Sequence, residues 1–438
     1  MKHIYFLGIG GIGMSNLARY YNFAGVKVSG YDKTPSTVTQ ALENEGISIF
    51  FDENEKQFEG ITDIVYTPAI KEHIAFEIAK ERGIIPKKRS QILGEICKNY
   101  ETLGVAGTHG KTTTSTLLAH LTRFCGVDTT AFLGGISKNL NGNFAFGKSE
   151  FCVVEADEFD RSFLTLFPKY AIITSLDADH LDIYGKHEDM LVSYRDFAHQ
   201  VSGKLLVNSE IAAFDWQREV ETYGIESGKY QAQNLRFANL ATTFDYVSEE
   251  VTIKDISLPL PGRHNVSNAT AAITLMLWAG GNAEKVREAL ADFKGIERRF
   301  EVVSHTETLS LINDYAHHPT ELSAAIGTAK SLFPDRQVIA VFQPHLFTRT
   351  RDFYEGFAEA LSMADVAILI PIYPAREKPI EGITSDIILQ KISLEKKVLI
   401  EKEALNETIQ GFIEKPTVIL ILGAGDIDRD VGKLKVKS

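Results

Sequence analysis

Cysteine and long apolar runs are both scarce in this sequence, and their scarcity limits the class of protein. Only three cysteines occur among 438 residues, at Cys97, Cys125 and Cys152, and none has CxxC or metal-ligand spacing. An odd count without a framework is typical of a reducing compartment. No run approaches the roughly 18 apolar residues of a membrane span, and the apolar N-terminal stretch is too short and too interrupted by glycine for a signal peptide. We therefore expect a cytoplasmic protein with no membrane partner.

Positive charge is scarce as well. The chain has 46 Lys and Arg against 58 Asp and Glu, which is a formal net charge of −12. This excess of negative charge disfavours non-specific binding of nucleic acid. It does not exclude a single anionic ligand, because a local cluster of basic residues can override the net field. We expect no nucleic-acid partner, and a monomer or a weak homodimer.

Strand-like and helix-like patterns alternate along almost the whole chain. The apolar (44%) and charged (24%) fractions are those of a globular protein, and the length suggests about three domains. Alternation of this kind predicts an α/β fold, in which helices cover parallel sheets. Breaks in the pattern place the domains at 1–98, 99–296 and 297–438.

A glycine-rich turn near the start of the chain has the pattern of a phosphate-binding loop. Gly8, Gly10 and Gly13 match G-x-G-x-x-G after a predicted strand at 3–7, and Asp32 follows about 20 residues later. Glycine lets the backbone approach a pyrophosphate, and the next helix offers N–H groups and the positive end of its dipole. The alternative is a tight turn without a ligand. The pattern does not distinguish NAD from a UDP-sugar.

A second glycine-rich turn follows a predicted strand at 102–106. It resembles a P-loop, in which Lys111 would contact the β- and γ-phosphates and Thr112 would bind Mg²⁺. Val105 stands where the usual pattern has its first glycine, so the match is incomplete. The predicted strand before it and the predicted helix at 113–124 favour phosphate binding over an incidental turn. The residues of this turn are Gly107, Thr108, His109, Gly110, Lys111, Thr112 and Thr113.

The two glycine-rich turns are called the first and second cradles below. Two acidic turns are expected beside the second cradle. One begins at Glu155, after a predicted strand at 151–154. The other follows a predicted strand at 170–175 and contains Asp177, Asp179 and His180. The carboxyl ends of parallel strands meet at one edge of a sheet, and oxygen ligands suit Mg²⁺, so together the turns predict a magnesium site. For each turn alone the alternative is a solvated loop, and for His180 it is a structural role.

Together these motifs resemble the Mur ligase family of peptidoglycan synthesis. The resemblance covers nearly the whole chain, and the matching segments come in family order. They are GIGGIGMSNLA (8–18), GTHGKTTT (107–114), EADEFDRSF (155–163), DADHLDIYG (177–185), GRHNVSNATAA (262–272), ERRFE (297–301), NDYAHHPTE (313–321), FQPHLFTRTRDF (342–353) and GAGDI (423–427). The resemblance implies a Rossmann-like domain for a UDP-sugar, a central P-loop ATPase-type parallel sheet, and a Rossmann-like C-terminal domain for an amino acid.

The resemblance also implies roles for single residues. The UDP-sugar would be bound by Gly8, Gly10, Gly11, Gly13 and Asp32. ATP would be bound by the P-loop turn, with His264, Asn265, Asn268, Arg298 (or Arg299) and Asp314. The magnesium ligands would be Thr112, Glu155 and His180, and the amino acid would meet Tyr315, His317, His345 and Arg349. Lys111, His180 and Arg349 would be the catalytic residues.

Local alternatives and departures accompany these roles. Asn265 and Asn268 would also suit the cap of a helix, and His317–His318 a capping turn before Pro319. Arg349 and Arg351 could together form a solvated face, a role that is expected for Arg351 and not for Arg349. The family commonly has an arginine where Leu346 stands, which leaves Arg349 to hold the carboxylate of the amino acid. Asn313 replaces the first acid of the usual Asp-Asp-Tyr run.

The activity that the resemblance implies is ATP-dependent ligation of L-alanine to UDP-N-acetylmuramic acid, in peptidoglycan precursor synthesis. The lactyl carboxylate would attack the γ-phosphorus to give an acyl phosphate and ADP, and the amine would then displace phosphate. His180 and His345 are candidates for the base that takes the ammonium proton. Because donor and acceptor motifs lie in different domains, we expect the outer domains to close on the central one.

Three other functions are compatible with parts of the sequence. A sibling ligase would attach a whole peptide to the same sugar, but the HHPTE and TRTRD segments favour a single amino acid. An NAD-dependent dehydrogenase would explain the first cradle and leave the second without a purpose. A nucleotide sensor without catalysis would not need Lys111, Thr112, Glu155 and His180.

Overall fold

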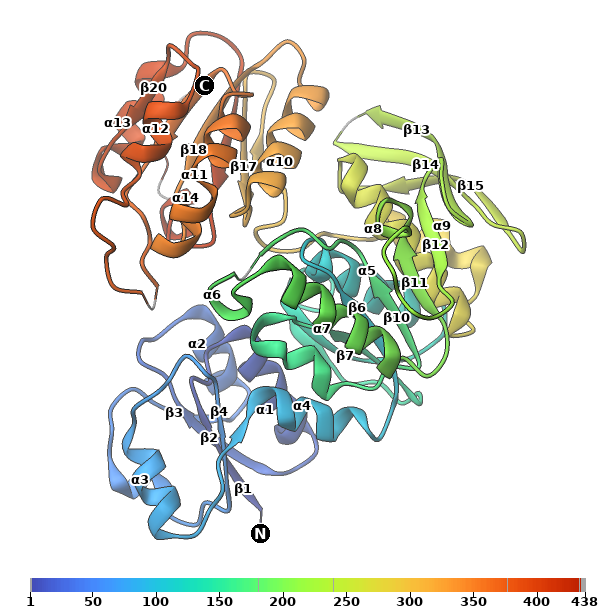
Figure 1. Ribbon diagram of the computed structural model, residues 1–438, viewed down its shortest axis with the longest axis vertical. Coiled ribbons are helices and arrows are strands. Elements are labelled where there is room, and N and C mark those ends of the chain that lie inside the picture. The colour runs from blue at the N-terminus through green and yellow to red at the C-terminus, as the bar shows by residue number, and fades with distance from the viewer. Residues whose placement is uncertain (1, 180, 239, 376, 433, 435–438) are drawn as a thin grey trace. The chain divides into compact units, whose positions relative to one another are not determined.

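The computed structural model is an α/β protein with three sheets, as the sequence predicts (Figure 1), and it describes residues 2–179, 181–238, 240–375, 377–432 and 434. The chain divides into two compact units. The first comprises Met1–Gln233, Tyr246–Lys254 and Ser267–Lys294, and the second comprises Asn234–Asp245, Asp255–Val266 and Gly295–Ser438. The domain boundaries expected near 98 and 296 stay a prediction.

The first sheet is parallel and has the strand order β3-β2-β1-β4-β5. Its strands are β1 (His3–Leu7), β2 (Lys27–Tyr31), β3 (Ser48–Phe50), β4 (Asp63–Tyr66) and β5 (Lys87–Lys88). Its helices are α1 (Ile12–Phe23), α2 (Thr37–Asn44), α3 (Ile74–Glu81), α4 (Arg89–Cys97) and the short 3₁₀ helix η1 (Glu55–Phe58). Side chains alternate across β1, so Ile4 and Phe6 join one core while Tyr5 and Leu7 join another. Apolar cores therefore cover both faces.

The second sheet has ten strands in the order β15-β14-β13-β12-β11-β10-β6-β9-β7-β8. They are β6 (Glu101–Ala106), β7 (Thr130–Ser137), β8 (Gly142–Ala145), β9 (Phe151–Glu155), β10 (Tyr170–Ile173), β11 (Leu205–Asn208), β12 (Glu221–Ile225), β13 (Tyr230–Ala238), β14 (Ala241–Val247) and β15 (Thr252–Leu258). The strands around β6 are parallel, as expected for a P-loop sheet. Because β8 runs antiparallel to β7, the whole sheet is mixed.

The helices that accompany the second sheet follow the strands closely along the chain. They are α5 (Lys111–Phe124), α6 (Leu181–Tyr184), α7 (His187–Gln200), α8 (Arg263–Trp278), α9 (Val286–Ala291), and the 3₁₀ helices η2 (Phe159–Thr165), η3 (Ser209–Ile211) and η4 (Ala283–Lys285). The helix α5 starts directly after the glycine-rich turn, two residues earlier than the sequence predicts. Lys111 and Thr112 therefore lie in its first turn.

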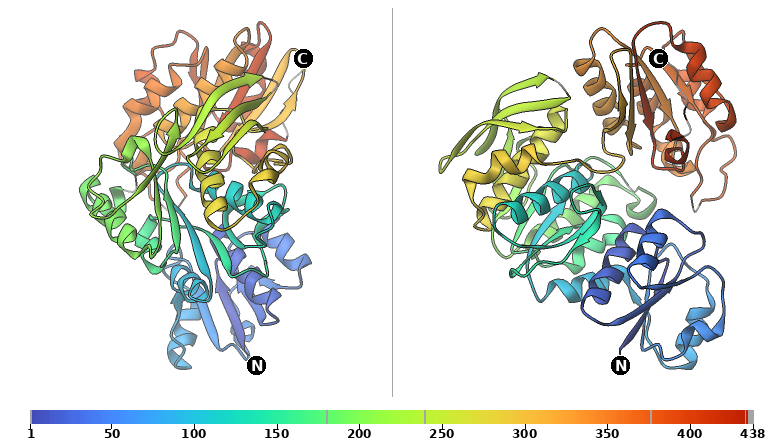
Figure 2. Two further views of the ribbon diagram at one scale, coloured as in Figure 1. Left: turned by 90° about the vertical axis from the view of Figure 1, so that its right-hand side faces the viewer. Right: turned by 180° about the vertical axis from the view of Figure 1, so that it is seen from behind.

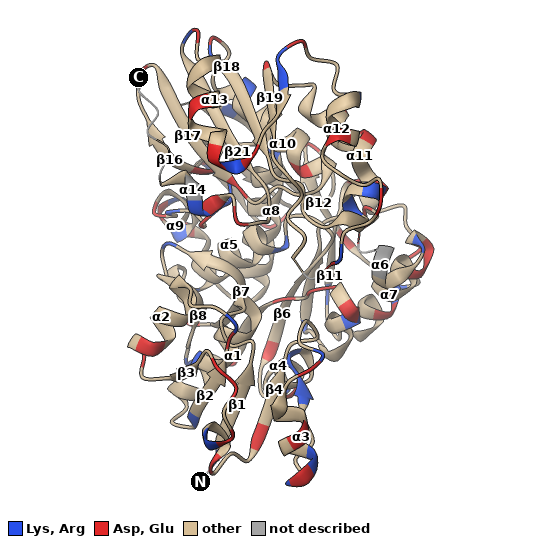
Figure 3. Cartoon of the chain, turned by 90° about the vertical axis from the view of Figure 1, so that its left-hand side faces the viewer, with Lys and Arg blue, Asp and Glu red and all other residues tan. Residues whose placement is uncertain are grey.

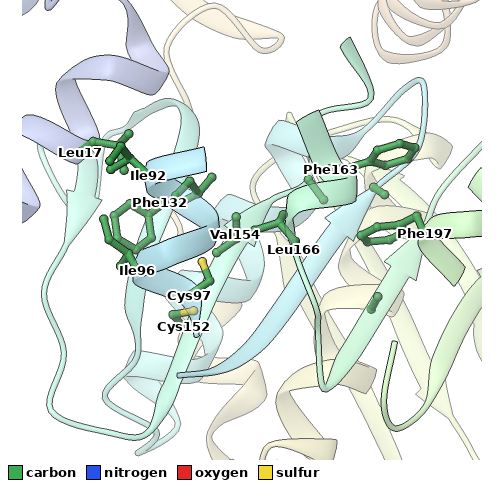
Figure 4. Packing of buried hydrophobic residues seen from close by; sticks show 14 of the residues in the cluster. Leu17, Ile92, Ile96, Cys97, Phe132, Cys152, Val154, Phe163, Leu166 and Phe197 are labelled. Atoms are coloured by element: carbon green, nitrogen blue, oxygen red, sulfur yellow. The ribbon is translucent and has the colours of Figure 1, made fainter. Parts of the chain in front are cut away.

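Helices α1 and α4 of the first sheet pack on strands of the second within the first unit. One apolar cluster joins them, and Figure 4 shows its side chains from α1 (Leu17), α4 (Ile92, Ile96, Cys97), β7 (Phe132) and β9 (Cys152, Val154). Asn143 adds polar contacts, since its side chain donates to the carbonyl of Ile12 (2.6 Å) and contacts Ser15 (3.0 Å). The first cradle is thus anchored to the central sheet.

The third sheet belongs to the second unit and has the order β16-β17-β21-β18-β19-β20. Its strands are β16 (Glu301–His305), β17 (Leu309–Asp314), β18 (Gln337–Phe342), β19 (Val366–Leu369), β20 (Lys397–Leu399) and β21 (Thr417–Leu422). Its helices are α10 (Pro319–Leu332), α11 (Phe347–Leu361), α12 (Asp386–Lys391), α13 (Leu405–Phe412), α14 (Asp428–Val431) and the 3₁₀ helix η5 (Lys402–Ala404). Among the described residues of this sheet, β16 runs antiparallel to β17, and the other paired strands are parallel. Helices cover both faces of this sheet (Figure 2).

The described part of the chain contains no helix that is both long enough and apolar enough to cross a bilayer. Basic and acidic residues are interspersed over the elements of all three sheets (Figure 3). Binding of an anion therefore has to depend on local groups and not on the overall field.

Candidate active site

The second glycine-rich turn joins the end of β6 to the start of α5. Gly107 has φ +124° and Gly110 has φ +81°, a region of backbone conformation that favours glycine. A Cβ atom at Gly107 would lie 2.0 Å from Oγ1 of Thr174, and one at Gly110 would lie 2.7 Å from Oδ1 of Asn268. Both glycines are therefore required by close packing. The turn presents the N-terminus of α5, as an anion site needs.

Lys111 is tied to this turn and to a buried acid. Its ammonium group donates to the carbonyl oxygens of Gly107 (2.7 Å) and Thr108 (3.3 Å), and it lies 2.7 Å from a carboxylate oxygen of Glu158. Burial lowers the pKa of Lys111, but Glu158 and the neighbouring carboxylates raise it more, so the pKa lies above its usual value. The lysine is thus charged and poised at the cradle. Glu158 belongs to the acidic segment EADEFDRSF (155–163), but the sequence does not indicate which of its acids is buried.

The turn after β10 meets the P-loop, as the strand order predicts. Oγ of Ser175 contacts Oγ1 of Thr108 (2.9 Å) and accepts the amide N–H of His109 (2.9 Å). The amide of Asp177 donates to Thr108 (3.0 Å), and its carboxylate lies 3.3 Å from the ring of His109. Asp179 is buried. His180, predicted as a catalytic and magnesium-binding residue, lies outside the described residues.

Glu155 lies beside the first turn of α5. Its Oε1 accepts from Oγ1 of Thr112 (3.1 Å), and its Oε2 accepts from Ser115 (3.4 Å) and from the amide of Gly134 (3.1 Å). A hydroxyl and a carboxylate at this spacing are hard oxygen ligands that suit Mg²⁺. Within the described ranges, no three His, Cys, Asp or Glu residues form a metal cluster. Thr112 and Glu155 fit a magnesium ion because both offer oxygen ligands. The full predicted ligand set stays a prediction.

The first cradle has the expected strand–turn–helix form. Gly8 has φ +82°, and α1 begins one residue after Gly11. Asp32 turns back onto this cradle, where its Oδ2 accepts the amide N–H of Gly10 at 2.8 Å. A Cβ atom at Gly13 would lie 2.6 Å from a guanidinium nitrogen of Arg89. Asp32 therefore shapes the turn, while its role toward a ligand stays a prediction.

Two basic residues that the sequence did not single out connect the first cradle with the acidic turn after β9. Arg89 lies 3.4 Å from Asp157, and Lys88 lies 2.8 Å from Asp160. Asp160 has φ +54°, an unusual conformation for an aspartate. The contact of Arg89 with Gly13 would be visible only from the fold, since the two residues are 76 positions apart.

In the second unit, Arg298 precedes β16 and Asp314 is the last residue of β17. The guanidinium of Arg298 donates to the carbonyls of Gly423 (2.7 Å) and Gly425 (3.1 Å) and lies 4.6 Å from the ring of Tyr315. Both oxygens of Asp314 accept amide N–H groups, from Phe300 (2.6 Å) and Ala316 (2.7 Å). Burial raises the pKa of Asp314 to about 6, although Arg299 and these hydrogen bonds lower it. Asp314 thus fixes the segment that enters the sheet.

The predicted amino-acid residues gather at one end of the third sheet. The rings of Tyr315 and His317 lie 5.3 Å apart, those of His317 and His345 lie 6.4 Å apart, and His345 stacks on Tyr373 at 5.8 Å. His318 is the N-cap of α10, so the capping alternative holds for this residue. The structure therefore brings together three of the four predicted side chains.

Arg349, the fourth, is buried in α11 and is not part of a solvated face. Arg351 is half exposed and pairs with Asp352, as expected for a solvated position. Leu346 is buried with φ +70°, and its amide donates to the carbonyl of Tyr373 (3.0 Å). The strain of a non-glycine residue at this φ is typical of functional sites.

Three residues predicted to bind ATP, His264, Asn265 and Asn268, occupy the first turns of α8. Asn268 is buried beside Gly110 in the first unit. In the second unit, Asn265 is buried, and its side chain donates to the carbonyl of Pro261 at 2.7 Å. Asn265 therefore ties the first turn of α8 to the segment that precedes it. His264 is exposed at the same helix end.

Comparison with known proteins agrees with this geometry. Family models match residues 3–101 (Mur ligase family, catalytic domain), 105–276 (Mur ligase middle domain) and 298–425 (Mur ligase, glutamate ligase domain). The chain is 45% identical over 446 residues to the UDP-N-acetylmuramate–L-alanine ligase of Christiangramia forsetii, covering 99% of this chain and 97% of that protein. It is 45% identical over 457 residues to the enzyme of the same name from Porphyromonas gingivalis, covering 99% and 98%.

Solved structures show the same relationship. The UDP-N-acetylmuramate–alanine ligase from Thermotoga maritima superposes with a TM-score of 0.85 at 28% identity, covering 99% of this chain and 98% of that one. A murein peptide ligase from Psychrobacter arcticus has a TM-score of 0.73 at 23% identity, with 99% and 98% covered, and so shows a shared fold. Because the models cover all three sheets and the relatives match almost from end to end, the chain belongs to the Mur ligase family of ATP-dependent ligases.

Proposed function

We propose that this protein ligates L-alanine to the lactyl carboxylate of UDP-N-acetylmuramic acid, with ATP as the energy source, in cytoplasmic peptidoglycan precursor synthesis. The observation that carries the proposal is the end-to-end match at up to 45% identity with proteins of that named activity. The geometry supports it, because one unit holds two anion cradles and the other gathers the residues predicted for the amino acid.

The chemistry begins with activation of an unreactive carboxylate. Lys111 is placed at the N-terminus of α5, where it would balance the charge that develops on the transferred phosphoryl group. The residues that fit Mg²⁺ are Thr112 and Glu155, and the ion would supply charge neutralisation at the β- and γ-phosphates. The lactyl carboxylate then attacks the γ-phosphorus, and ADP leaves. The product of this step is an acyl phosphate.

The second step joins the amine to the activated acyl carbon. The buried guanidinium of Arg349 supports binding of the amino-acid carboxylate, since a bidentate pair would fix its orientation. Tyr315, His317 and His345 would surround the rest of the small substrate. Shielding the acyl phosphate from water requires closure around it.

The test is ATP-dependent release of phosphate with Mg²⁺ and UDP-N-acetylmuramic acid, with one acceptor added at a time. L-alanine, glycine, L-serine and a muropeptide tripeptide are the acceptors. We expect the fastest release with L-alanine and a ligated product of the corresponding mass. Glycine and L-serine should react more slowly but detectably, because a pocket distinguishes one methyl group by only about 1–3 kcal/mol.

The other outcomes identify the alternatives. Release with the tripeptide alone would retain ligase chemistry and assign the chain to peptide addition. No release with any acceptor, together with tight nucleotide binding, would indicate a sensor.

A further inference from the structure

His317 is held by two acceptors on the same ring nitrogen. Its Nδ1 lies 2.9 Å from the carbonyl oxygen of Tyr315 and 3.2 Å from Oε2 of Glu321. A carbonyl oxygen can only accept a hydrogen bond, so Nδ1 carries the proton. In the neutral ring the lone pair is then on Nε2. The nitrogen that would meet a substrate is therefore a proton acceptor.

Glu321 is fixed in position by the backbone. Its Oε2 also accepts the amide N–H groups of His317 (2.9 Å) and His318 (3.2 Å), in the capping box at the start of α10. Hydrogen bonds of this kind favour the ionised carboxylate. A carboxylate at Nδ1 orients the imidazole and stabilises the imidazolium that forms when Nε2 takes a proton.

Two opposing effects act on a positive charge at this ring. The positive end of the α10 dipole disfavours a cation at this position, whereas Glu321 favours it. The titratable groups beside the ring include Glu321, Tyr315 and His345. Asp314 and His264 lie close enough to Glu321 to interact with its charge, and Arg298 and Arg299 lie over the ring of Tyr315. The side chains of His317 and Glu321 are 18% and 17% exposed, so part of the pair borders solvent while most of it is shielded.

We propose that His317 is the base that deprotonates the incoming amino acid, with Glu321 as its positioning residue. This inference rests on the proposed function. Nε2 takes a proton from the ammonium group, and the freed nitrogen lone pair forms the C–N bond with the acyl carbon. The bond from that carbon to the phosphate oxygen breaks, and phosphate leaves with the electron pair. The second proton lost by nitrogen goes to the leaving phosphate, and His317 returns its proton to solvent.

This assignment differs from the candidates that the sequence suggested. His345 stacks its ring on Tyr373, with an interplanar angle of 15°, which suits a wall of the site. His317 has the carboxylate partner and the fixed tautomer that a base needs. Tyr315, at its edge, would separate this pair from Arg298.

The decisive experiment compares two nucleophiles in His317→Gln. L-alanine arrives protonated at pH 7 and needs a base, whereas hydroxylamine is largely neutral and does not. We expect kcat/KM for L-alanine to fall by about 10²–10⁴-fold, while hydroxamate formation from the acyl phosphate stays within a few-fold of the wild type. Raising the pH should restore ligation in the variant by about tenfold per unit, because it supplies neutral amine.

Two further variants separate proton transfer from structure. Glu321→Gln keeps an oxygen for the amide hydrogen bonds but removes the charge, so we expect the same selective loss with a smaller magnitude. His305→Gln, on β16 and outside the proposed site, should leave both reactions unchanged. Equal loss of both reactions in His317→Gln would overturn the base assignment, as would full activity with L-alanine. Absence of hydroxamate with the wild type would instead overturn the acyl-phosphate route itself.

Discussion

The ammonium group of Lys111 lies 2.7 Å from the carboxylate of Glu158, whose side chain is fully buried. In the ligand-free protein, Glu158 is the negatively charged partner of Lys111. Phosphates of a bound nucleotide would take over this role. A buried charge without its partner is expensive, whereas a complete pair is close to neutral in its effect on stability. The state of this pair should therefore report on nucleotide binding.

Glu158→Gln is expected to destabilise the ligand-free protein by about 3–5 kcal/mol, because it leaves Lys111 partly uncompensated. Magnesium and ATP should recover much of this loss, since phosphates would replace the missing charge. Denaturant unfolding with and without nucleotide measures both effects. The variant Glu77→Gln, on α3, is a suitable control for the loss of one acid. An equal loss of stability with and without nucleotide would contradict the prediction that phosphates replace Glu158 as the partner of Lys111.

Lys111→Ala should reduce turnover by at least about 10²–10³-fold while UDP-sugar affinity stays nearly unchanged, because the two cradles are separate. The substitution also leaves Glu158 buried without its lysine. The double variant Lys111→Ala/Glu158→Gln removes both charges and should be the more stable of the two. Calorimetric titration of the UDP-sugar into both variants checks the binding. Undiminished turnover would remove the P-loop assignment.

Gly134→Ala should weaken magnesium use without unfolding the protein. A Cβ atom there would lie 2.2 Å from Oε2 of Glu155, and this flexible carboxylate is the group that has to move. Displacing a ligand or its support typically costs about 10–100-fold in metal affinity. The Mg²⁺ concentration for half-maximal activity should rise accordingly. Gly142→Ala on the neighbouring strand, where the nearest atom is 4.0 Å away, should leave that concentration unchanged.

The sequence predicted the motifs that local patterns define. Both cradles, the strands that precede them and the turn at Glu155 depend on glycine spacing and strand–helix alternation, and all appear as expected. The start of α5 was predicted two residues late, because the glycine turn leads directly into the helix. The meeting of Ser175 and Asp177 with the P-loop followed from the rule that the ends of parallel strands share an edge.

Contacts between distant segments were not predictable in the same way. Arg89 lies against Gly13, Gly134 lies against Glu155, and Glu158 instead of its neighbours pairs with Lys111. Each depends on how separate elements pack, which one sequence does not encode locally. The pairing of His318 with Glu321 is an exception, because a spacing of three residues at a helix start is the recognisable capping-box pattern.

The domain motion expected from the sequence becomes more specific with the structure. Because α1 and α4 pack on β7 and β9 in one apolar cluster, we expect the first sheet and the P-loop strands of the second sheet to move together, and the third sheet to close. Spin labels on cysteines introduced at Lys33 and Lys148 should keep their distance when an ATP analogue and the UDP-sugar are added. The native cysteines are buried and should remain unlabelled.

A label pair that joins Lys148 with Glu395, in the second unit, should show a change in its distance distribution on addition of the same ligands. The pair within the first unit is the control for local effects of the labels. A change in the Lys33–Lys148 distance without a change in the Lys148–Glu395 distance would contradict the prediction that the third sheet moves relative to the first.

The pH dependence of the second unit should reflect Asp314. Burial raises the pKa of this carboxyl from its ordinary value of 3.8 to about 6 in the folded protein. The folded state therefore holds the proton more tightly, so the contribution of Asp314 is fully present below about pH 4 and is lost as the pH rises through 6. A difference of about two pKa units corresponds to about 3 kcal/mol.

Asp314→Asn removes this titration and one of the two acceptors for the amides of Phe300 and Ala316. At pH 5 the segments around these two amides should open more readily in the variant than in the wild type. This difference should shrink by pH 7, where the wild type has lost the stabilising contribution of Asp314. Hydrogen–deuterium exchange of peptides that contain both amides measures local opening at each pH, with the variant and wild type compared under identical conditions. A deficit that grows with pH would mean that the carboxyl titrates below its usual range, and that the hydrogen bonds from the two amides outweigh its burial.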